Sequence, residues 1–244
     1  MADEIDVRRL KEMSLENGTI MAAFPTVHII SAIAAGFLID TLKLDQICAL
    51  DSNDFPPISM IYAKKPKFPA RVYASEEHNI ALFVSEFSPK PKVCRPLGRL
   101  ILTWAKEQNC KKIISLEGLP TDKKIDGEPK VVGIGSTDSA RKELEEHGIE
   151  QIELGMTVGV TAVLLNEGRW EDINVISLIG ESQRDIPDAR VAASLVRAVD
   201  KLFPAVKFDM SPLDKMVVEI EKRIKQVRSQ AEPVIKPPAE LMYR

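Results

Sequence analysis

Short apolar runs alternate with longer amphipathic stretches along most of the chain. Residues 19–24 form an apolar run closed by Pro25, and residues 27–42 follow with apolar side chains at helical spacing. This pattern predicts a strand, a turn and a buried helix. The helix is apolar nearly all round, but Asp40 and Lys43 end it well short of a membrane span.

The same alternation continues to residue 203. We expect strands at residues 46–50, 58–62, 71–75, 79–87, 111–116, 131–134 and 173–179. We expect helices at residues 97–105, 137–147, 157–166 and 187–203. The three strands between residues 58 and 87 are typical of an antiparallel group, and Gly118 and Pro120 are expected to end the strand that follows. Such alternation predicts an α/β fold of three layers, α/β/α, around a mixed, mainly parallel sheet.

A C-terminal amphipathic helix is predicted over residues 209–228. Ser211, Pro212 and Asp214 match an N-cap, a first-turn proline and an acidic capping-box position. Apolar residues then recur every three or four positions along one narrow seam: Leu213, Val217, Ile220, Ile224 and Val227. The seam suits either packing on its own domain or a subunit interface, because two heptads do not distinguish the two. We predict an oligomerisation helix here, after an α/β domain over residues 1–208.

The last sixteen residues, 229–244, have the composition of an extended tail. Pro233, Pro237 and Pro238 forbid a regular helix. The chain then ends in Leu241, Met242, Tyr243 and Arg244, which place apolar side chains and a tyrosine directly before a free carboxylate. Exposed apolar anchors beside a terminal charge suit a pocket on another protein. The alternative is a tail that folds back on its own subunit.

Composition narrows the class of protein. The chain has 33 Lys and Arg and 36 Asp and Glu, and the resulting net charge of −3 argues against a nucleic-acid binder. Hydrophobic residues make up 45% of the chain, which excludes general disorder. The charged N-terminus and the lack of a long apolar run predict no signal peptide and no membrane partner. Cys48, Cys94 and Cys110 are irregularly spaced, which predicts a reduced, cytoplasmic protein, and neither they nor the histidines suggest a metal site.

Two glycine-containing segments resemble catalytic or cofactor motifs only in part. Gly133 and Gly135 precede a predicted helix, but Asp138 stands at the third position of the dinucleotide motif, so we interpret this turn as a helix cap. Residues 180–184, GESQR, follow a strand but lack the second glycine of a nucleophile elbow. We therefore expect no catalytic residue and no cofactor.

Other polar clusters have structural interpretations that we favour. Glu181 and Arg184, with the nearby Asp185 and Asp188, follow a strand at the edge where open α/β sheets bind ligands, but a polar loop explains them. A second set of small residues, Gly155, Thr157, Gly159 and Thr161, forms a face for close packing. His28 is interpreted as a partly buried residue at the start of the first helix.

Several segments together resemble the proteasome assembly chaperone family, in particular the archaeal homologues related to the second eukaryotic chaperone. The resemblance covers roughly residues 19–228. Beyond the opening strand and helix, it rests on SLEGLP at 115–120, GMTVGVTAVLL at 155–165 and IGESQRDIPDARVAASLVRAVDKLF at 179–203. It implies an α/β domain of the nucleoside phosphorylase type, without established catalytic residues, that binds proteasome subunits.

The resemblance also implies a binding partner for the C-terminal tail. Met242, Tyr243 and Arg244 match the hydrophobic, tyrosine, any-residue ending with which proteasome activators and some of these chaperones dock between α-subunits of the core particle. We therefore expect a non-enzymatic, cytoplasmic, homo-oligomeric adaptor that presents several tails to the α-ring. The alternative is a nucleoside- or nucleotide-processing enzyme that uses a crevice around His28, Glu181 and Arg184.

Overall fold

The computed structural model describes residues 5–26, 29–62, 64–121, 125, 127–183 and 189–203, and beyond these 209, 212–213, 215 and 217–219. The chain divides into two compact units, residues 1–208 and residues 209–244. The tail and Ile220, Ile224 and Val227 of the predicted seam lie outside the described residues.

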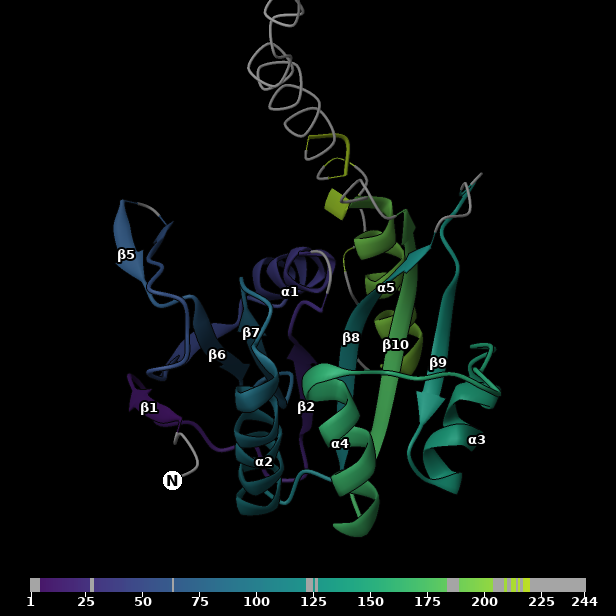
Figure 1. The fold of residues 1–244 in the computed structure, drawn as a ribbon, viewed down its shortest axis with the longest axis horizontal. Coiled ribbons are helices and arrows are strands. Elements are labelled where there is room, and N and C mark those ends of the chain that lie inside the picture. The colour runs from purple at the N-terminus through teal and green to yellow at the C-terminus, as the bar shows by residue number, and fades with distance from the viewer. Residues whose placement is uncertain are drawn as a thin grey trace, which may run out of the picture. The chain divides into compact units, whose positions relative to one another are not determined.

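The first unit is built on an eight-stranded sheet (Figure 1). In sheet order its strands are β1 (Asp6–Arg9), β3 (Asp45–Asp51), β6 (Ala70–Ser75), β7 (Ile80–Ser85), β2 (Thr19–Ala23), β8 (Lys112–Thr121), β10 (Asn174–Gln183) and β9 (Val131–Gly135). A separate two-stranded sheet pairs β4 (Met60–Tyr62) with β5 (Lys65–Lys67). The helices are α1 (Ile30–Thr41), α2 (Pro91–Glu107), α3 (Asp138–Glu146), α4 (Gly159–Trp170) and α5 (Ala189–Leu202).

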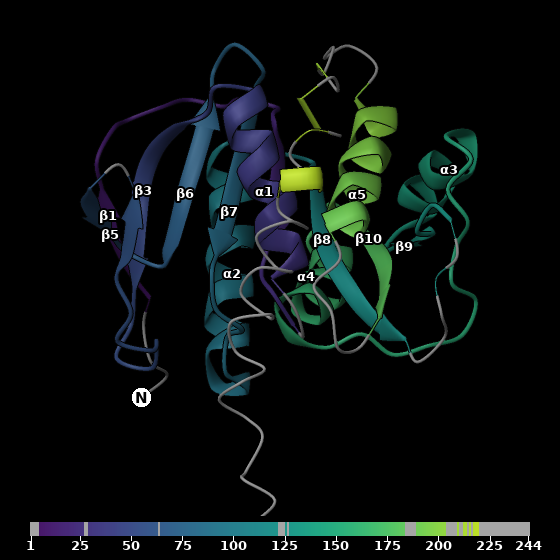
Figure 2. The same ribbon diagram turned by 90° about the horizontal axis from the view of Figure 1, so that it is seen from above.

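The three-layer α/β/α fold is confirmed. Helices α2 and α4 lie side by side on one face of the sheet, and α1 and α5 pack together on the other (Figures 1 and 2). The central strand β2 faces both layers, and its residues Ile20, Met21, Ala22 and Ala23 are all fully buried. A strand buried on both faces is apolar throughout rather than alternating, which is why the run at 19–24 could be recognised.

The sheet is mixed, as expected, but parallel pairing is confined to its centre. Strand β2 pairs in parallel with β7 and β8, and β8 pairs in parallel with β10. The other four pairings, β1 with β3, β3 with β6, β6 with β7 and β10 with β9, are antiparallel. The expectation of a mainly parallel sheet is corrected to that extent.

Strand β8 does not end at Gly118 and Pro120, contrary to the sequence prediction. It continues to Thr121, and its second half pairs with β10 alone, because β2 leaves it after Ser115. A strand with one free edge tolerates a proline, which has no N–H to donate. A β-carbon at Gly118 would lie 3.0 Å from Ile30 Cδ1, so this glycine lets α1 approach closely.

Two other strand predictions need correction. Residues 58–62 do not join the antiparallel group of β6 and β7, because β4 pairs only with β5 in the projecting hairpin visible in Figure 1. The edge strand β1 was not predicted. Its residues are exposed or half-buried and largely charged, so its sequence lacks the apolar pattern of a strand.

A buried ion pair ties the start of the hairpin to the main sheet. Arg71 is 3% exposed, forms an ion pair with Glu86, and donates from Nη1 to the carbonyl oxygen of Phe68 at 2.7 Å. The Tyr62 hydroxyl of β4 donates to Glu86 Oε1 at 2.9 Å, and the Arg71 guanidinium lies over its ring. These contacts pair both Nη atoms of Arg71 and Glu86 Oε1, whereas Arg71 Nε and Glu86 Oε2 are buried without a hydrogen-bond partner among the described residues.

Candidate functional site

One crevice of the first unit lies where the parallel strands end. Strand β2 pairs with β8 only as far as Ser115, and beyond it the Thr26 hydroxyl lies 3.5 Å from the carbonyl oxygen of Gly118. The N-terminal turns of α2 and α4 both line a cavity at this edge of the sheet. Open α/β sheets commonly bind ligands at this edge.

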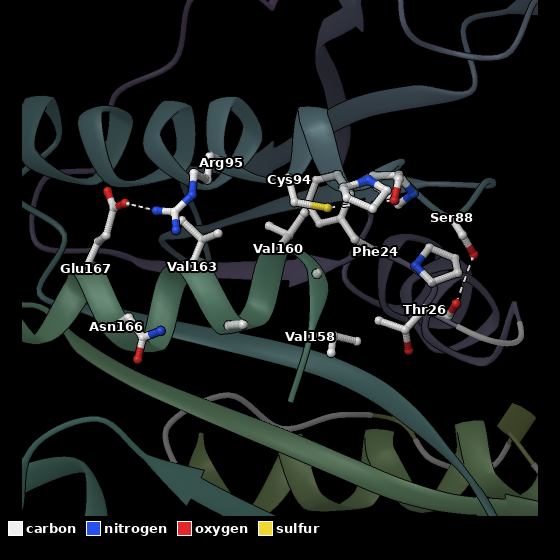
Figure 3. A pocket seen from close by; sticks show the side chains of 15 residues that line it. Phe24, Thr26, Ser88, Cys94, Arg95, Val158, Val160, Val163, Asn166 and Glu167 are labelled. Carbon is white, nitrogen blue, oxygen red and sulfur yellow. Dashed lines mark hydrogen bonds and ion pairs between the residues drawn. The ribbon is translucent and has the colours of Figure 1, made fainter. Parts of the chain in front are cut away.

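A first cavity of about 460 Å³ lies between α2 and α4 (Figure 3). Several of its polar side chains form hydrogen bonds or ion pairs. Ser88 Oγ donates to the Thr26 carbonyl at 3.3 Å, and the Cys94 thiol donates to the Lys90 carbonyl at 3.3 Å. At its mouth Arg95 and Glu167 point toward one another across the two helices, with Arg95 Nη1 3.4 Å from Glu167 Oε1.

Two potentially reactive side chains line this first cavity, the Cys94 thiol and the Glu167 carboxylate. Burial raises the pKa of the Cys94 thiol, so little of the nucleophilic thiolate forms at neutral pH. The Glu167 carboxylate forms an ion pair with Arg95 and a second one with Arg99, whose Nε lies 3.2 Å from Glu167 Oε2. Among the described residues that line it, we find no nucleophile hydrogen-bonded to a general base.

A second cavity, of about 260 Å³, adjoins the first, and Thr26 and Val158 line both. It contains Glu117, a carboxyl near the middle of β8 opposite Ile179 of β10. Glu117 is only 6% exposed. Its Oε2 accepts a hydrogen bond from the Thr157 hydroxyl at 3.3 Å, while its Oε1 is buried and has no partner in the part of the chain described.

Burial changes the acidity of Glu117. Removal from water raises the pKa of its carboxyl to about 7, against the opposing effect of the Thr161 and Thr157 hydroxyls. The Thr161 hydroxyl of α4 also forms a hydrogen bond with the hydroxyl of Ser115, which lies on β8 like Glu117. A buried carboxyl that ionises near neutral pH within a cavity is a frequent property of functional sites.

The sequence prediction missed Glu117 as a site residue. It stands in the segment SLEGLP, which was used only as a family resemblance. A charged residue inside an apolar strand, followed by glycine, is a signal that could have found it, because Glu is almost never fully buried unless it is paired.

The glycines at 133 and 135 precede a helix cap, as the sequence indicated, and they also allow close packing of strand β9. Thr137 is the N-cap of α3, and its hydroxyl accepts from the Ala140 N–H at 3.1 Å. Asp138 lies in the first turn and pairs with Arg141. A β-carbon at Gly135 would lie 2.6 Å from the Arg141 backbone nitrogen, so the glycine allows the strand to approach the helix.

Of the residues named for the alternative enzyme, only Glu181 is among the described residues. His28, Arg184, Asp185 and Asp188 lie outside the described residues. Glu181 belongs to β10 and lines neither of the two cavities. Residue 180 needs to be glycine for packing, because a β-carbon there would lie 2.5 Å from Val191 Cγ1.

The face of small residues at 155–161 is divided between a loop and a helix. Helix α4 begins at Gly159, whose φ of +77° favours glycine, so Gly155 and Thr157 precede it. Closest helix packing occurs elsewhere, because a β-carbon at Gly98 of α2 would lie 2.6 Å from Val163 Cγ1 of α4. The threonines instead face Glu117.

Only part of the predicted oligomerisation and docking residues can be placed. In the second unit, Leu213 is 1% exposed and Val217 is half-buried, whereas Val218 beside them is half-exposed. Leu241, Met242, Tyr243 and Arg244 lie outside the described residues, as do Ser211 and Asp214 of the predicted cap. The roles of the seam and of the tail remain predictions.

Neither a metal-binding cluster nor a helix able to span a membrane is found among the described residues. There, His, Cys, Asp and Glu form no group of three or more that could hold a metal ion. None of the helices that the structure describes has the length and apolarity needed to cross a bilayer.

Comparison with known proteins gives a consistent family. The model of the PAC2 family matches residues 21–228. The structure of PbaA from Pyrococcus furiosus, described as an archaeal homolog of proteasome-assembly chaperone, is similar with a TM-score of 0.81 and 28% identity, over 95% of this chain and 100% of that one.

Two further relatives extend the comparison. PbaB from Pyrococcus furiosus, described as an archaeal proteasome activator, has the same fold, with a TM-score of 0.77 and 24% identity over 93% of this chain and 100% of that one. An uncharacterized protein from Methanocaldococcus jannaschii is 25% identical over 230 residues, which is 94% of this chain and 93% of the relative.

Proposed function

This chain belongs to the PAC2 family, and we propose that it is a non-enzymatic, cytoplasmic adaptor that binds the α-ring of the proteasome core particle, as an assembly chaperone or an activator-like protein. The observation that carries the proposal is its similarity over nearly its whole length to PbaA. The fold is also similar to that of PbaB, which is described as a proteasome activator, so we include activation of the core particle as the second form of this role.

The proposed contact is made by the tail. Met242 and Tyr243 enter a pocket between neighbouring α-subunits, Leu241 packs beside them, and the carboxylate of Arg244 pairs with a cation there. The helix with the seam from Leu213 to Val227 joins several copies of the chain. Several tails held together raise the affinity of a weak single tail by orders of magnitude.

The test is binding of purified core particle to tail variants of the full chain. Deletion of residues 242–244, or Tyr243→Ala, should weaken binding at least about 30-fold, because an aromatic anchor contributes about 2 kcal/mol or more at an interface. Glu240→Ala, a change in the same tail outside the motif, should leave binding unaltered. Binding unchanged in the deleted chain would contradict the tail mechanism but not the family assignment.

A further inference from the structure

The cavity around Glu117 has one charged group in an apolar wall. Glu117 is the one ionisable side chain among the described residues that line it, and Ile134, Ile152 and Ile179 supply much of the rest. Its volume of about 260 Å³ is enough for a small group or a single long side chain. Such a combination selects a ligand that is apolar along its length and polar at one point.

The unpaired carboxylate oxygen of Glu117 defines where the polar group of the ligand must lie. Oε2 receives the Thr157 hydroxyl, but Oε1 is buried without a hydrogen bond from any described residue. Leaving a buried acceptor unpaired is costly, and more so when the group carries a charge. No described cation lines the cavity to neutralise it. A ligand that brings both a donor and a positive charge satisfies both needs.

The rim of the cavity is apolar and open to solvent. Leu154 is 95% exposed and Met156 is 87% exposed, both on the segment that leads into α4, and Val158 follows them at 53%. Adjacent exposed apolar side chains at the mouth of a cavity are typical of a binding site, whereas single apolar side chains scattered over a surface are not. The stem of a bound ligand would cover them.

We propose that this cavity binds a primary ammonium group carried on an unbranched apolar stem, with the nitrogen donating to Glu117 Oε1 and the stem lying against Met156 and Leu154. A free alkylamine and the side chain of a lysine on another protein share this chemistry. The site is independent of the tail and goes beyond the proposed binding of the α-ring.

Binding at this site should depend on pH. The groups that face Glu117 are the Thr157 and Thr161 hydroxyls from the α4 side and Ile179 from β10, with Thr26 across the cavity, so among the described residues no other charge titrates there. Because its pKa is about 7, Glu117 is roughly 90% ionised at pH 8 and about 3% at pH 5.5, so an ammonium ligand should bind on the order of 30-fold more tightly at pH 8.

The experiment is a titration of the full chain with n-hexylamine at pH 8 and pH 5.5, followed by NMR or calorimetry, with 1-hexanol as the uncharged match. Glu117→Gln should abolish the preference for the amine while weak binding of hexanol persists. Met156→Ser should weaken the amine several-fold. Trp170→Ser is the matched control: Trp170 is 83% exposed but does not line the cavity, so this variant should bind the amine as tightly as the original chain.

A peptide blocked at both ends, with one lysine between two leucines, separates the two sources. Binding of hexylamine alone indicates a free amine, and binding of the peptide indicates a lysine of a partner. The proposal is overturned if neither probe binds, if hexylamine binds equally at both pH values, or if Glu117→Gln, shown to be folded, binds it as well as the original chain.

Discussion

Glu117 makes the stability of the domain depend on pH. Below about pH 4.5 the carboxyl is protonated in the folded and the unfolded chain alike. Between about pH 4.5 and 7 the unfolded chain releases this proton while the folded chain retains it, because burial holds its pKa at about 7. The free energy of unfolding therefore falls by about 3 kcal/mol as pH rises through this window, and the loss is complete above it.

Glu117→Gln should remove this part of the pH dependence. We expect the original chain to lose about 3 kcal/mol more than the variant between pH 4.5 and pH 8, since the amide does not ionise. Urea unfolding at both pH values measures the difference. Parallel losses in the two proteins would show that Glu117 ionises at an ordinary pKa.

The ion pair of Arg71 and Glu86 is the second residue-scale feature with a measurable consequence. Arg71→Met should destabilise the domain by about 3 kcal/mol or more, because it leaves the Glu86 carboxylate buried and uncompensated. The double variant Arg71→Met with Glu86→Leu should recover much of that loss. Chemical denaturation of the three proteins provides the comparison, and an equally unstable double variant would argue against an electrostatic cause.

At the scale of elements, two helical glycines should respond in opposite ways to the same substitution. Gly98→Ala should destabilise the domain by about 1–3 kcal/mol, because the added carbon overlaps Val163 and forces α2 away from α4. Gly36→Ala in α1 has nothing within 4 Å of the added carbon and should stabilise it by up to about 1 kcal/mol.

Thermal or urea unfolding of both variants tests the pair of glycine predictions. A third protein, Gly98→Ala with Val163→Ala, has room for the added carbon and should recover part of the loss. If Gly98→Ala proves as stable as Gly36→Ala, the helix packing described here is wrong at that contact.

Elements with a regular apolar pattern could be predicted from the sequence, and those shaped by neighbours could not. Strand β2 was located because burial on both faces leaves a continuous apolar run, and helix α1 because its sequence is apolar nearly all round. The extension of β8 past Gly118 and Pro120 depends on where β2 stops pairing, which the local sequence does not contain. The edge strand β1 is held by β3 and has almost no apolar signal of its own.

The candidate site was predicted less well than the fold. Sequence reasoning considered ligand chemistry around Glu181 and Arg184 but favoured a polar loop there; Glu181 belongs to strand β10, and Arg184 lies outside the described residues. Glu117 escaped notice because the unusual property is its burial, and burial follows from how the segment before α4 covers β8. The oligomerisation and docking residues stay predictions from the sequence.

At the scale of the whole molecule, the seam of the C-terminal helix should determine the oligomeric state. Ile220→Asp with Ile224→Asp should yield a folded monomer, because two carboxylates in an apolar interface cannot be accommodated. Val218→Asp, beside the seam and already half-exposed, should leave the assembly intact. Light scattering coupled to size exclusion gives the masses, and an unaltered mass for the double variant would assign the seam to packing within one chain.

The three cysteines give the molecule a practical property. Cys48, Cys94 and Cys110 are all buried, and burial raises the pKa of each thiol. Maleimides react with thiolates that they can reach, so the native protein should be labelled slowly. A cysteine introduced as Ser229→Cys would then accept a fluorophore almost selectively, and the polarisation of its emission would report in real time when the end of the chain is captured by another particle.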